Sequence, residues 1–75
     1  MPPSITDIYR HTKSGNLYMI IGLAYSADDG RPLIVYKALY DDTRMWVRNH
    51  EEFFGKVEIN GEEVDRFENI KIPKL

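Results

Sequence analysis

The stretch Lys56-Val-Glu-Ile-Asn-Gly-Glu-Glu-Val-Asp65 carries the clearest local pattern in this sequence of 75 residues. Asn60 and Gly61, at its centre, both tolerate a positive φ, which a two-residue type I′ turn requires. Such a turn joins two antiparallel strands and places Glu58 opposite Glu63. Because like charges that face each other destabilise a sheet, we expect both glutamates to lie in solvent, the alternative being a basic partner.

Turn residues divide the rest of the chain into short stretches rich in aromatic and β-branched residues. These stretches predict strands at residues 8–11, 17–25, 33–40, 45–48 and 66–70. Gly22 interrupts the longest stretch and permits a bend or a bulge. Residues 50–54 are too few for a full helix and predict one 3₁₀ or helical turn, ending at Gly55. This succession predicts an all-β fold, a small SH3-type barrel of five or six short antiparallel strands.

The length allows one domain, and a hydrophobic content of 43% is too high for a disordered chain. We expect an N-terminal extension at 1–7, the barrel at 8–70 and a C-terminal tail at 71–75. The absence of cysteine excludes disulfides and thiolate metal sites. The start of the chain has no signal-peptide pattern, and the apolar stretch at 17–25 is too short to span a bilayer. We therefore expect a soluble cytoplasmic protein.

The charge balance bears on the class of partner. Ten basic side chains stand against 12 acidic ones, for a net charge of −2. Acidic side chains predominate between residues 49 and 69. Binding to duplex nucleic acid normally requires a basic surplus or a strong basic stripe. The charge therefore disfavours a general nucleic-acid binder.

The sequence offers little for metal binding or catalysis. His50 begins a zincin-like motif, but Phe54 stands where the second histidine is needed. Adjacent acidic pairs such as Asp41 and Asp42 point to opposite faces of a strand and do not chelate together. We expect no metal, no cofactor and no enzymatic activity. His11 is the candidate general base of the enzymatic alternative, but a hydrogen bond within its own strand and turn is its more ordinary role.

Aromatic and basic side chains gather in the first two-thirds of the chain. Strand alternation predicts a core face made of Met19, Ile21, Leu23, Val35, Leu39, Met45 and Val47. The same alternation predicts an outward face made of Tyr18, Tyr36, Tyr40, Trp46 and Arg48. Such a face stacks a planar group and holds an anionic or carbonyl group. The alternative is that the rings close the ends of the barrel, and Lys37 on the supposed core face favours this opposite assignment. The candidate binding residues are Tyr9, Arg10, His11, Tyr18, Tyr36, Lys37, Tyr40, Trp46 and Arg48.

An ordered set of short motifs carries a family resemblance. The set is Tyr9-Arg10-His11-x-Lys13, Leu17-Tyr18, Val35-Tyr36-Lys37-Ala38-Leu39-Tyr40, Trp46-Val47-Arg48 and Arg66-Phe67-Glu68-x-Ile70. Over residues 8–70 it resembles DUF1653, a bacterial family of short proteins of unknown function. The resemblance implies an SH3-type barrel, a bacterial cytoplasmic protein and no established activity. Asn49 stands where the family usually has proline, and Gly55 where an acidic residue is more usual.

The segment Ala38-Leu39-Tyr40-Asp41-Asp42 also resembles the ALYDY segment of true SH3 domains, whose tyrosines line a polyproline groove. In those domains the segment lies near the start and a tandem tryptophan follows, whereas here it lies in mid-chain and Trp46 stands alone. We do not assign that role to it.

The function that we expect is a non-catalytic binding module that contacts a protein segment through Tyr36, Trp46 and Arg48. Two alternatives are the binding of a nucleotide or single-stranded nucleic acid and self-association through the same aromatic patch.

Overall fold

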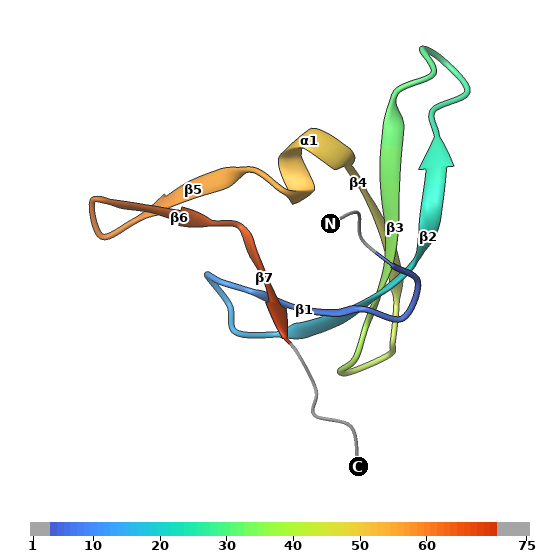
Figure 1. Ribbon diagram of the computed structural model, residues 1–75. Helices are drawn as coiled ribbons and strands as arrows, with labels where there is room; N and C mark the ends of the chain where they lie inside the picture. Colours follow the sequence, from blue (N-terminus) through green and yellow to red (C-terminus); the bar gives the residue numbers. More distant parts are fainter. Residues whose placement is uncertain (1–3, 71–75) are drawn as a thin grey trace.

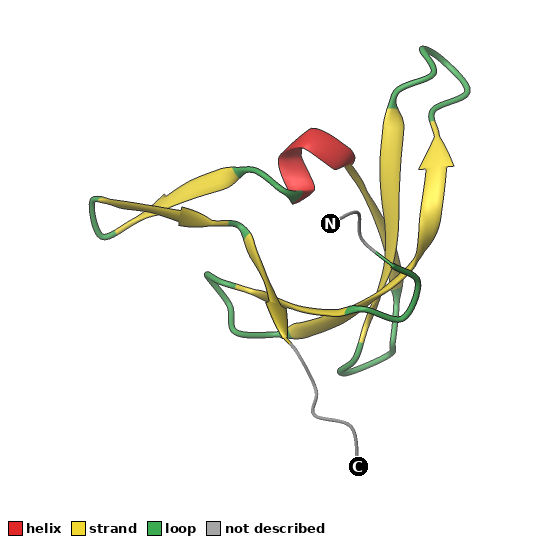
Figure 2. Ribbon diagram, viewed as in Figure 1, coloured by secondary structure: helices red, strands yellow, loops and turns green. Residues whose placement is uncertain are grey.

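The computed structural model describes residues 4–70, so the expected tail at 71–75 and the start of the expected extension lie outside the described residues. The elements are β1 (Ile8–His11), β2 (Leu17–Tyr25), β3 (Pro32–Ala38), β4 (Met45–Asn49), α1 (His50–Phe53), β5 (Lys56–Ile59), β6 (Glu62–Asp65) and β7 (Phe67–Ile70). Figure 1 and Figure 2 show that the strands dominate and that α1 is a single turn. Within the described residues, no helix is long and apolar enough to cross a membrane.

The strands form a five-stranded sheet in the order β4-β3-β2-β1-β7 and a separate hairpin of β5 and β6. Every pairing is antiparallel. The all-β class and the helical turn are confirmed, and residues 4–70 form seven strands where five or six were expected. The strand predicted at 66–70 is β7, which pairs with β1 after the chain leaves the hairpin. Among residues 4–70, no strand pairing joins the two sheets into a closed barrel.

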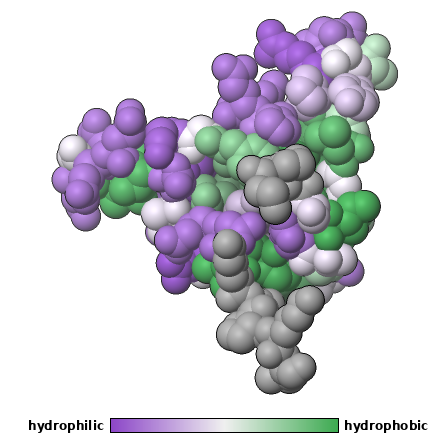
Figure 3. Space-filling model, in the orientation of Figure 1, coloured by the Kyte–Doolittle hydropathy of each residue, from purple (hydrophilic) through white to green (hydrophobic). Residues whose placement is uncertain are grey.

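The β5–β6 hairpin has the predicted register. Glu58 pairs with Glu63, and Asn60 and Gly61 take positive φ values of 53° and 80°. Both glutamates are exposed, as expected from their like charge. The hairpin extends away from the five-stranded sheet in Figure 1 and is mostly hydrophilic in Figure 3, whereas hydrophobic residues gather over β2 and β3. It therefore contributes little to the core.

The five-stranded sheet is irregular at one place. The register between β2 and β3 shifts between Ile20 and Gly22, which confirms the expected irregularity at this glycine. A bulge increases the local twist and bends the bulged strand. The bend lets the long strand β2 pair with β1 at one end and extend with β3 at the other (Figure 1).

The predicted core face is wrong, because the opposite set of residues is buried. Tyr36 is only 4% exposed, whereas Val47, which was assigned to the core, is 61% exposed. The core cluster consists of Tyr9, Ile20, Ile34, Tyr36, Phe53 and Phe67. Along β3 both faces carry apolar residues, and Lys37 was the one residue whose type indicated which face is exposed. Phe53 of α1 and Phe67 of β7 decide it, because their rings cover the face that carries Tyr36. This inner side of the sheet is called the concave face below.

The turn at 49–55 closes one end of the concave face. Asn49 Oδ1 accepts a hydrogen bond of 2.9 Å from the backbone N–H of Glu51 and so caps α1. Phe53 is fully buried and stacks on Phe67, with ring centroids 4.1 Å apart. A Cβ at Gly55 would lie 2.9 Å from the carbonyl oxygen of Glu51, so the turn is shaped for glycine. The two departures from the family pattern thus lie at the two ends of this one turn.

Candidate binding site at the open end of the concave face

Seven of the nine candidate residues lie on the concave face, and one of them, Tyr9, is buried in the core. The strand register places Tyr36 opposite Trp46 and Ile34 opposite Arg48. It also places Tyr18 opposite Tyr9 and Ala38, which belong to the same face. The other six candidates on this face are His11, Tyr18, Tyr36, Tyr40, Trp46 and Arg48. Strand alternation grouped all of these except His11 on one face. That face is the inner one, as in the alternative assignment that Lys37 favoured.

The other three candidates do not join this group. Tyr9 is buried, and its ring meets those of Phe53 and Phe54 edge to face. Arg10 lies on the opposite face of the sheet, where it forms an ion pair with Glu68. Lys37 also lies on that face, because it pairs in register with Met19 and Met45. The structure thus places these three residues in the core or on the far side of the sheet.

Tyr36 contributes its hydroxyl group rather than its ring. The ring is surrounded by those of Tyr18, Phe53 and Phe67, at centroid distances of 5.2 to 5.6 Å. Its hydroxyl oxygen accepts a hydrogen bond of 3.4 Å from Arg48 Nε. Tyr36 therefore holds the guanidinium group of Arg48 against the concave face. Of these two residues, Arg48 is the one that is available to a ligand.

Two tyrosine hydroxyl groups meet beyond Tyr36. The hydroxyl oxygens of Tyr18 and Tyr40 are 2.6 Å apart and share a hydrogen bond. Burial and this bond raise the pKa of Tyr18 to about 12. The hydroxyl of Tyr18 therefore stays protonated near neutral pH and is able to act as a hydrogen-bond donor.

His11 takes the ordinary role that the sequence suggested. Its Nδ1 lies 2.8 Å from the hydroxyl oxygen of Ser14, within the turn that follows β1. Burial, and next the positive charge of Arg48, lower the pKa of His11 below its usual value. The imidazole is therefore mostly neutral at pH 7. It forms the border of the aromatic cluster by packing on Phe67 at a centroid distance of 5.1 Å.

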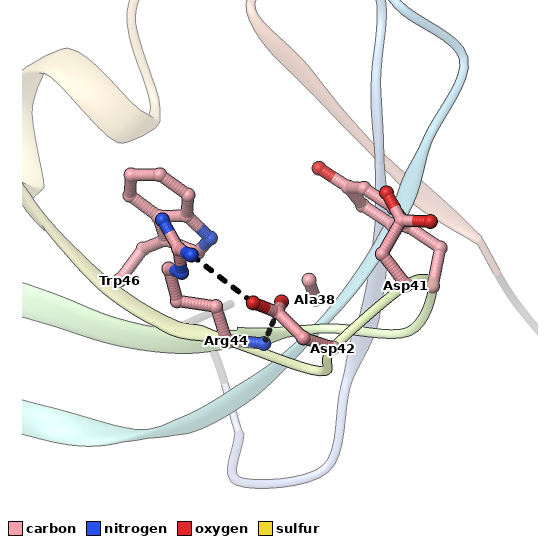
Figure 4. Close-up of a pocket in the computed structure, with 6 residues that line it drawn as sticks. Ala38, Asp41, Asp42, Arg44 and Trp46 are labelled. Atoms are coloured by element: carbon pink, nitrogen blue, oxygen red, sulfur yellow. Dashed lines mark hydrogen bonds and ion pairs between the residues drawn. The ribbon is translucent and has the colours of Figure 1, made fainter.

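The turn between β3 and β4 adds an open hollow of about 360 Å³ to the end of the concave face. Its lining consists of Ala38, Tyr40, Asp41, Asp42, Arg44 and Trp46. In Figure 4, Trp46 and Asp41 stand on opposite sides of the hollow, with Ala38 between them. The indole is 44% exposed, so its ring is available to a ligand. We call this hollow the Tyr40–Trp46 pocket.

The charges at the pocket are already partly paired. Arg44 forms an ion pair of 3.1 Å with Asp42 (Figure 4) and holds its guanidinium carbon 5.8 Å from the centre of the Trp46 ring. Arg48, farther along β4, faces Glu52 at 3.8 Å. The carboxylate of Asp41 is exposed at the rim. The site therefore combines aromatic surfaces with a rim on which carboxylates outnumber guanidinium groups.

The pocket turn has an unusual backbone. Asp41 and Thr43 have positive φ values of 49° and 54°. Aspartate tolerates this left-handed region, but a β-branched residue such as threonine rarely adopts it. Hydrogen bonds hold the conformation, from the Thr43 N–H to the Tyr40 carbonyl at 3.0 Å and from the Arg44 N–H to Asp42 Oδ1 at 3.1 Å. Backbone strain of this kind concentrates at functional sites.

Comparison with known proteins confirms the family resemblance. The model of the family described as "Protein of unknown function (DUF1653)" matches residues 7–69. The chain belongs to this family. It is also similar to the crystal structure of a DUF1653 protein from Bordetella bronchiseptica, with 26% sequence identity and a TM-score of 0.77. That match covers 99% of this chain and 95% of the other. A comparison with curated proteins finds no match.

In this DUF1653 member, the sequence analysis missed three polar residues of the pocket, Asp41, Asp42 and Arg44. The sequence pattern presented the two aspartates only as an adjacent acidic pair that does not chelate a metal. The likeness of residues 38–42 to the ligand-binding segment of SH3 domains was the one pattern that pointed to them, and it had been set aside. Among residues 4–70, no three His, Cys, Asp or Glu side chains come together as a metal site would require.

Proposed function

We propose that this domain is a non-catalytic binding module that holds a segment of another protein in the Tyr40–Trp46 pocket. The observation that carries the proposal is the exposed indole of Trp46 at the rim of a hollow that also includes Tyr40. An accessible aromatic surface beside a concavity is the usual anchor point of a peptide or protein ligand. Following the family resemblance, we place this role in the bacterial cytoplasm.

The chemistry of the pocket favours an extended segment that contains proline and a cationic side chain. Aromatic grooves bind proline-rich segments in the polyproline II conformation, whose backbone carbonyls are free to accept hydrogen bonds. The hydroxyl pair of Tyr18 and Tyr40, which has one proton outside its shared bond, and the guanidinium group of Arg48 supply donors beside the pocket. Asp41 at the rim is placed to attract a cationic side chain, and the Trp46 ring already has a guanidinium group over it.

The same charges count against a nucleotide or single-stranded nucleic acid. Phosphate binding requires cations that are free to neutralise the ligand. Arg44 is paired with Asp42, and Arg48 faces Glu52. Asp41 adds a negative charge at the rim. A phosphate group would therefore meet more carboxylates than unpaired guanidinium groups.

The test uses the single tryptophan of the chain as its reporter. Trp46 fluorescence and ¹H–¹⁵N NMR spectra are recorded during titration with a proline-rich peptide that contains arginine. The same peptide with glutamine in place of arginine, a mononucleotide and a short oligonucleotide serve as comparison ligands. We expect the arginine peptide alone to change the fluorescence strongly and to shift signals of residues 38–48.

Two variants with the same chemical change separate the pocket from general electrostatics. Asp41→Asn should weaken binding of the arginine peptide about tenfold, which corresponds to about 1.4 kcal/mol. Asp29→Asn, in the β2–β3 turn outside the pocket lining, should leave the affinity unchanged. Equal effects of both variants, or stronger binding of the oligonucleotide, would contradict the proposal.

A further inference from the structure

Strand β4 leaves one side of its backbone open. It stands at one end of the sheet order and pairs only with β3. The carbonyl of Arg44 accepts a bond of 2.9 Å from the Ala38 N–H, and Trp46 is paired with Tyr36. Because bonding groups alternate along an antiparallel strand, Trp46 and Arg48 direct their backbone groups at β3. Those of Met45, Val47 and Asn49 point away from the sheet, where no strand within residues 4–70 pairs with them.

The two edges of the five-stranded sheet differ in their protection. Edge strands normally carry lysine, proline, a bulge or inward-pointing charges that prevent pairing with other chains. On the β7 edge, Glu68 and Asn69 are polar and exposed. On the β4 edge the three successive residues Met45 to Val47 are apolar and exposed, and their pairing with β3 has no bulge. The β4 edge is therefore suited to add a further strand.

We propose that β4 pairs with β4 of a second copy of this chain, antiparallel and around a two-fold axis through Val47. The three residues with outward-facing backbone groups determine this register. An axis through Val47 pairs Val47 with its own counterpart and Met45 with Asn49 of the other copy. Asn49 contributes only its N–H, because the carbonyl of a capping residue is bonded within the helix. An axis through Trp46 would use residues whose groups are already bonded to β3. The result is one continuous sheet across both copies.

The side chains of β4 are complementary to themselves in this register. Trp46 comes to lie opposite Arg48 of the second copy, on the concave face, where a guanidinium group over an indole is favourable. The two Val47 side chains meet on the outer face. Antiparallel pairing also brings the Arg44 end of one strand toward the start of α1 in the other copy, which carries Glu51 and Glu52. Within the paired strands no like charges face each other.

The contact is small. A single pair of five-residue strands buries less than the roughly 1,000 Å² expected of a stable interface. We therefore expect a weak dimer with a dissociation constant between about 1 μM and about 1 mM. This inference does not rest on the proposed peptide binding, although Trp46 borders both surfaces.

Single cysteines test the register directly, because the chain has none of its own. In the proposed dimer the two residues 47 form a hydrogen-bonded pair with Cα atoms about 5.5 Å apart, within the range of a disulfide. The two residues 45 lie about 14 Å apart, beyond that range. In a glutathione redox buffer, Val47→Cys should form a covalent dimer at least tenfold faster than Met45→Cys. The exposed control Leu23→Cys, on β2, should be as slow as Met45→Cys.

Sedimentation equilibrium on the full chain gives the second readout. The average mass should rise above the 8.8 kDa of one chain as the concentration increases. Val47→Lys should abolish that rise, because it places two ammonium groups at the axis, while Leu23→Lys should not. A monomer at about 1 mM, a dimer that persists in Val47→Lys, or equal cross-linking rates for the three cysteine variants would each overturn the proposal. Titration of Val47→Lys with the arginine peptide at low protein concentration separates the β4 edge from the Tyr40–Trp46 pocket. A variant that cannot dimerise through β4 should still bind the peptide, because its pocket is unchanged.

Discussion

The two ends of the concave face are built from the same strands but serve different purposes. At the closed end, Phe53 of α1 stacks on Phe67 and excludes water from the sheet. At the open end, Tyr40 in the turn after β3 and Trp46 on β4 are not covered by α1, so the indole remains exposed. The difference shows that one short helical turn decides which aromatic residues stabilise the fold and which are left for a ligand.

The electrostatic environments of the two ends also differ. The closed end is apolar, whereas the open end holds the hydrogen-bonded hydroxyls of Tyr18 and Tyr40 and the guanidinium groups of Arg44 and Arg48. Polar groups that are only half-buried retain water that a ligand is able to displace. The open end is therefore the place where changes in side-chain chemistry should alter binding more than stability.

The largest expected contrast is between truncations of one aromatic residue at each end. Phe53→Ala removes a fully buried ring and should lower the free energy of unfolding by about 3–5 kcal/mol. Trp46→Ala removes a larger but exposed ring and should cost about 1 kcal/mol or less. Urea denaturation followed by circular dichroism measures both values. Similar losses for the two variants would mean that the open end is also part of the core.

How far the sequence predicts this structure depends on whether the deciding contacts are local. The register around Asn60 and Gly61 and the bounds of β1 and β2 were predicted correctly, because turn geometry and residue type act within a few positions. The buried face of β3 was predicted wrongly. Ile34 and Val35 are equally apolar, and the residues that select between them, Phe53 and Phe67, lie far along the chain.

The candidate site shows the same division. Residues of one strand parity share a face whichever face is buried, so most of the aromatic set was grouped correctly. Asp41 and Asp42 were missed as pocket residues because nothing local distinguishes a solvated turn from a turn that borders a hollow. Only the three-dimensional closure of the β3–β4 turn, with its positive φ values, reveals that role.

The next contrast concerns the ionisation of tyrosine at the open end. With a pKa of about 12, Tyr18 should ionise well after an ordinary tyrosine, whose pKa is near 10. Tyr40→Phe removes the shared hydrogen bond and should lower the pKa of Tyr18. Absorbance at 295 nm, compared with that of Tyr18→Phe, identifies the late step. Because the folded-state pKa is raised, this contribution to stability is complete below about pH 10 and is lost as the pH rises toward 12.

A tyrosine titration that shows no late step would indicate that the hydroxyls of Tyr18 and Tyr40 are fully solvated. In that case Tyr18 and Tyr40 would not share the hydrogen bond that fixes the positions of their hydroxyls at the open end. Tyr25→Phe is the matched control, because Tyr25 is exposed near the tip of the β2–β3 hairpin. This variant should leave the late step of Tyr18 unchanged.

A smaller change in stability is expected below neutral pH, where His11 gains a proton. Burial and the charge of Arg48 lower its pKa in the folded protein, so its contribution to stability is present above the unfolded value of about 6.5 and is lost as the pH falls through the folded value. The ¹³Cε1 chemical shift should report a lower pKa for His11 than for the same residue in the urea-unfolded chain. A pKa at or above that of the unfolded chain would contradict the buried, cation-facing position.

The smallest change in stability is expected at Thr43, and its sign is the informative part. The left-handed conformation costs an ordinary L residue about 1–2 kcal/mol, and glycine adopts it without that cost but loses about 0.5–1 kcal/mol through backbone entropy. Thr43→Gly should therefore stabilise the fold by up to about 1 kcal/mol. Ala27→Gly is the matched control in the exposed β2–β3 turn. Since Ala27 does not have a positive φ, glycine there should destabilise by about 0.5–1 kcal/mol.

Thr43→Gly also tests the contrast between the closed and open ends of the concave face, when peptide affinity is measured together with stability. If the Thr43 conformation serves the pocket, glycine should relieve the strain and at the same time weaken binding several-fold, because the turn that carries Asp41 and Asp42 loses its rigidity. A gain in stability without a loss of affinity would show that the strain belongs to the fold alone. Strain that is retained at a cost in stability in the turn that borders the exposed indole, and whose removal weakens binding, would instead be the mark of a surface that is selected for binding.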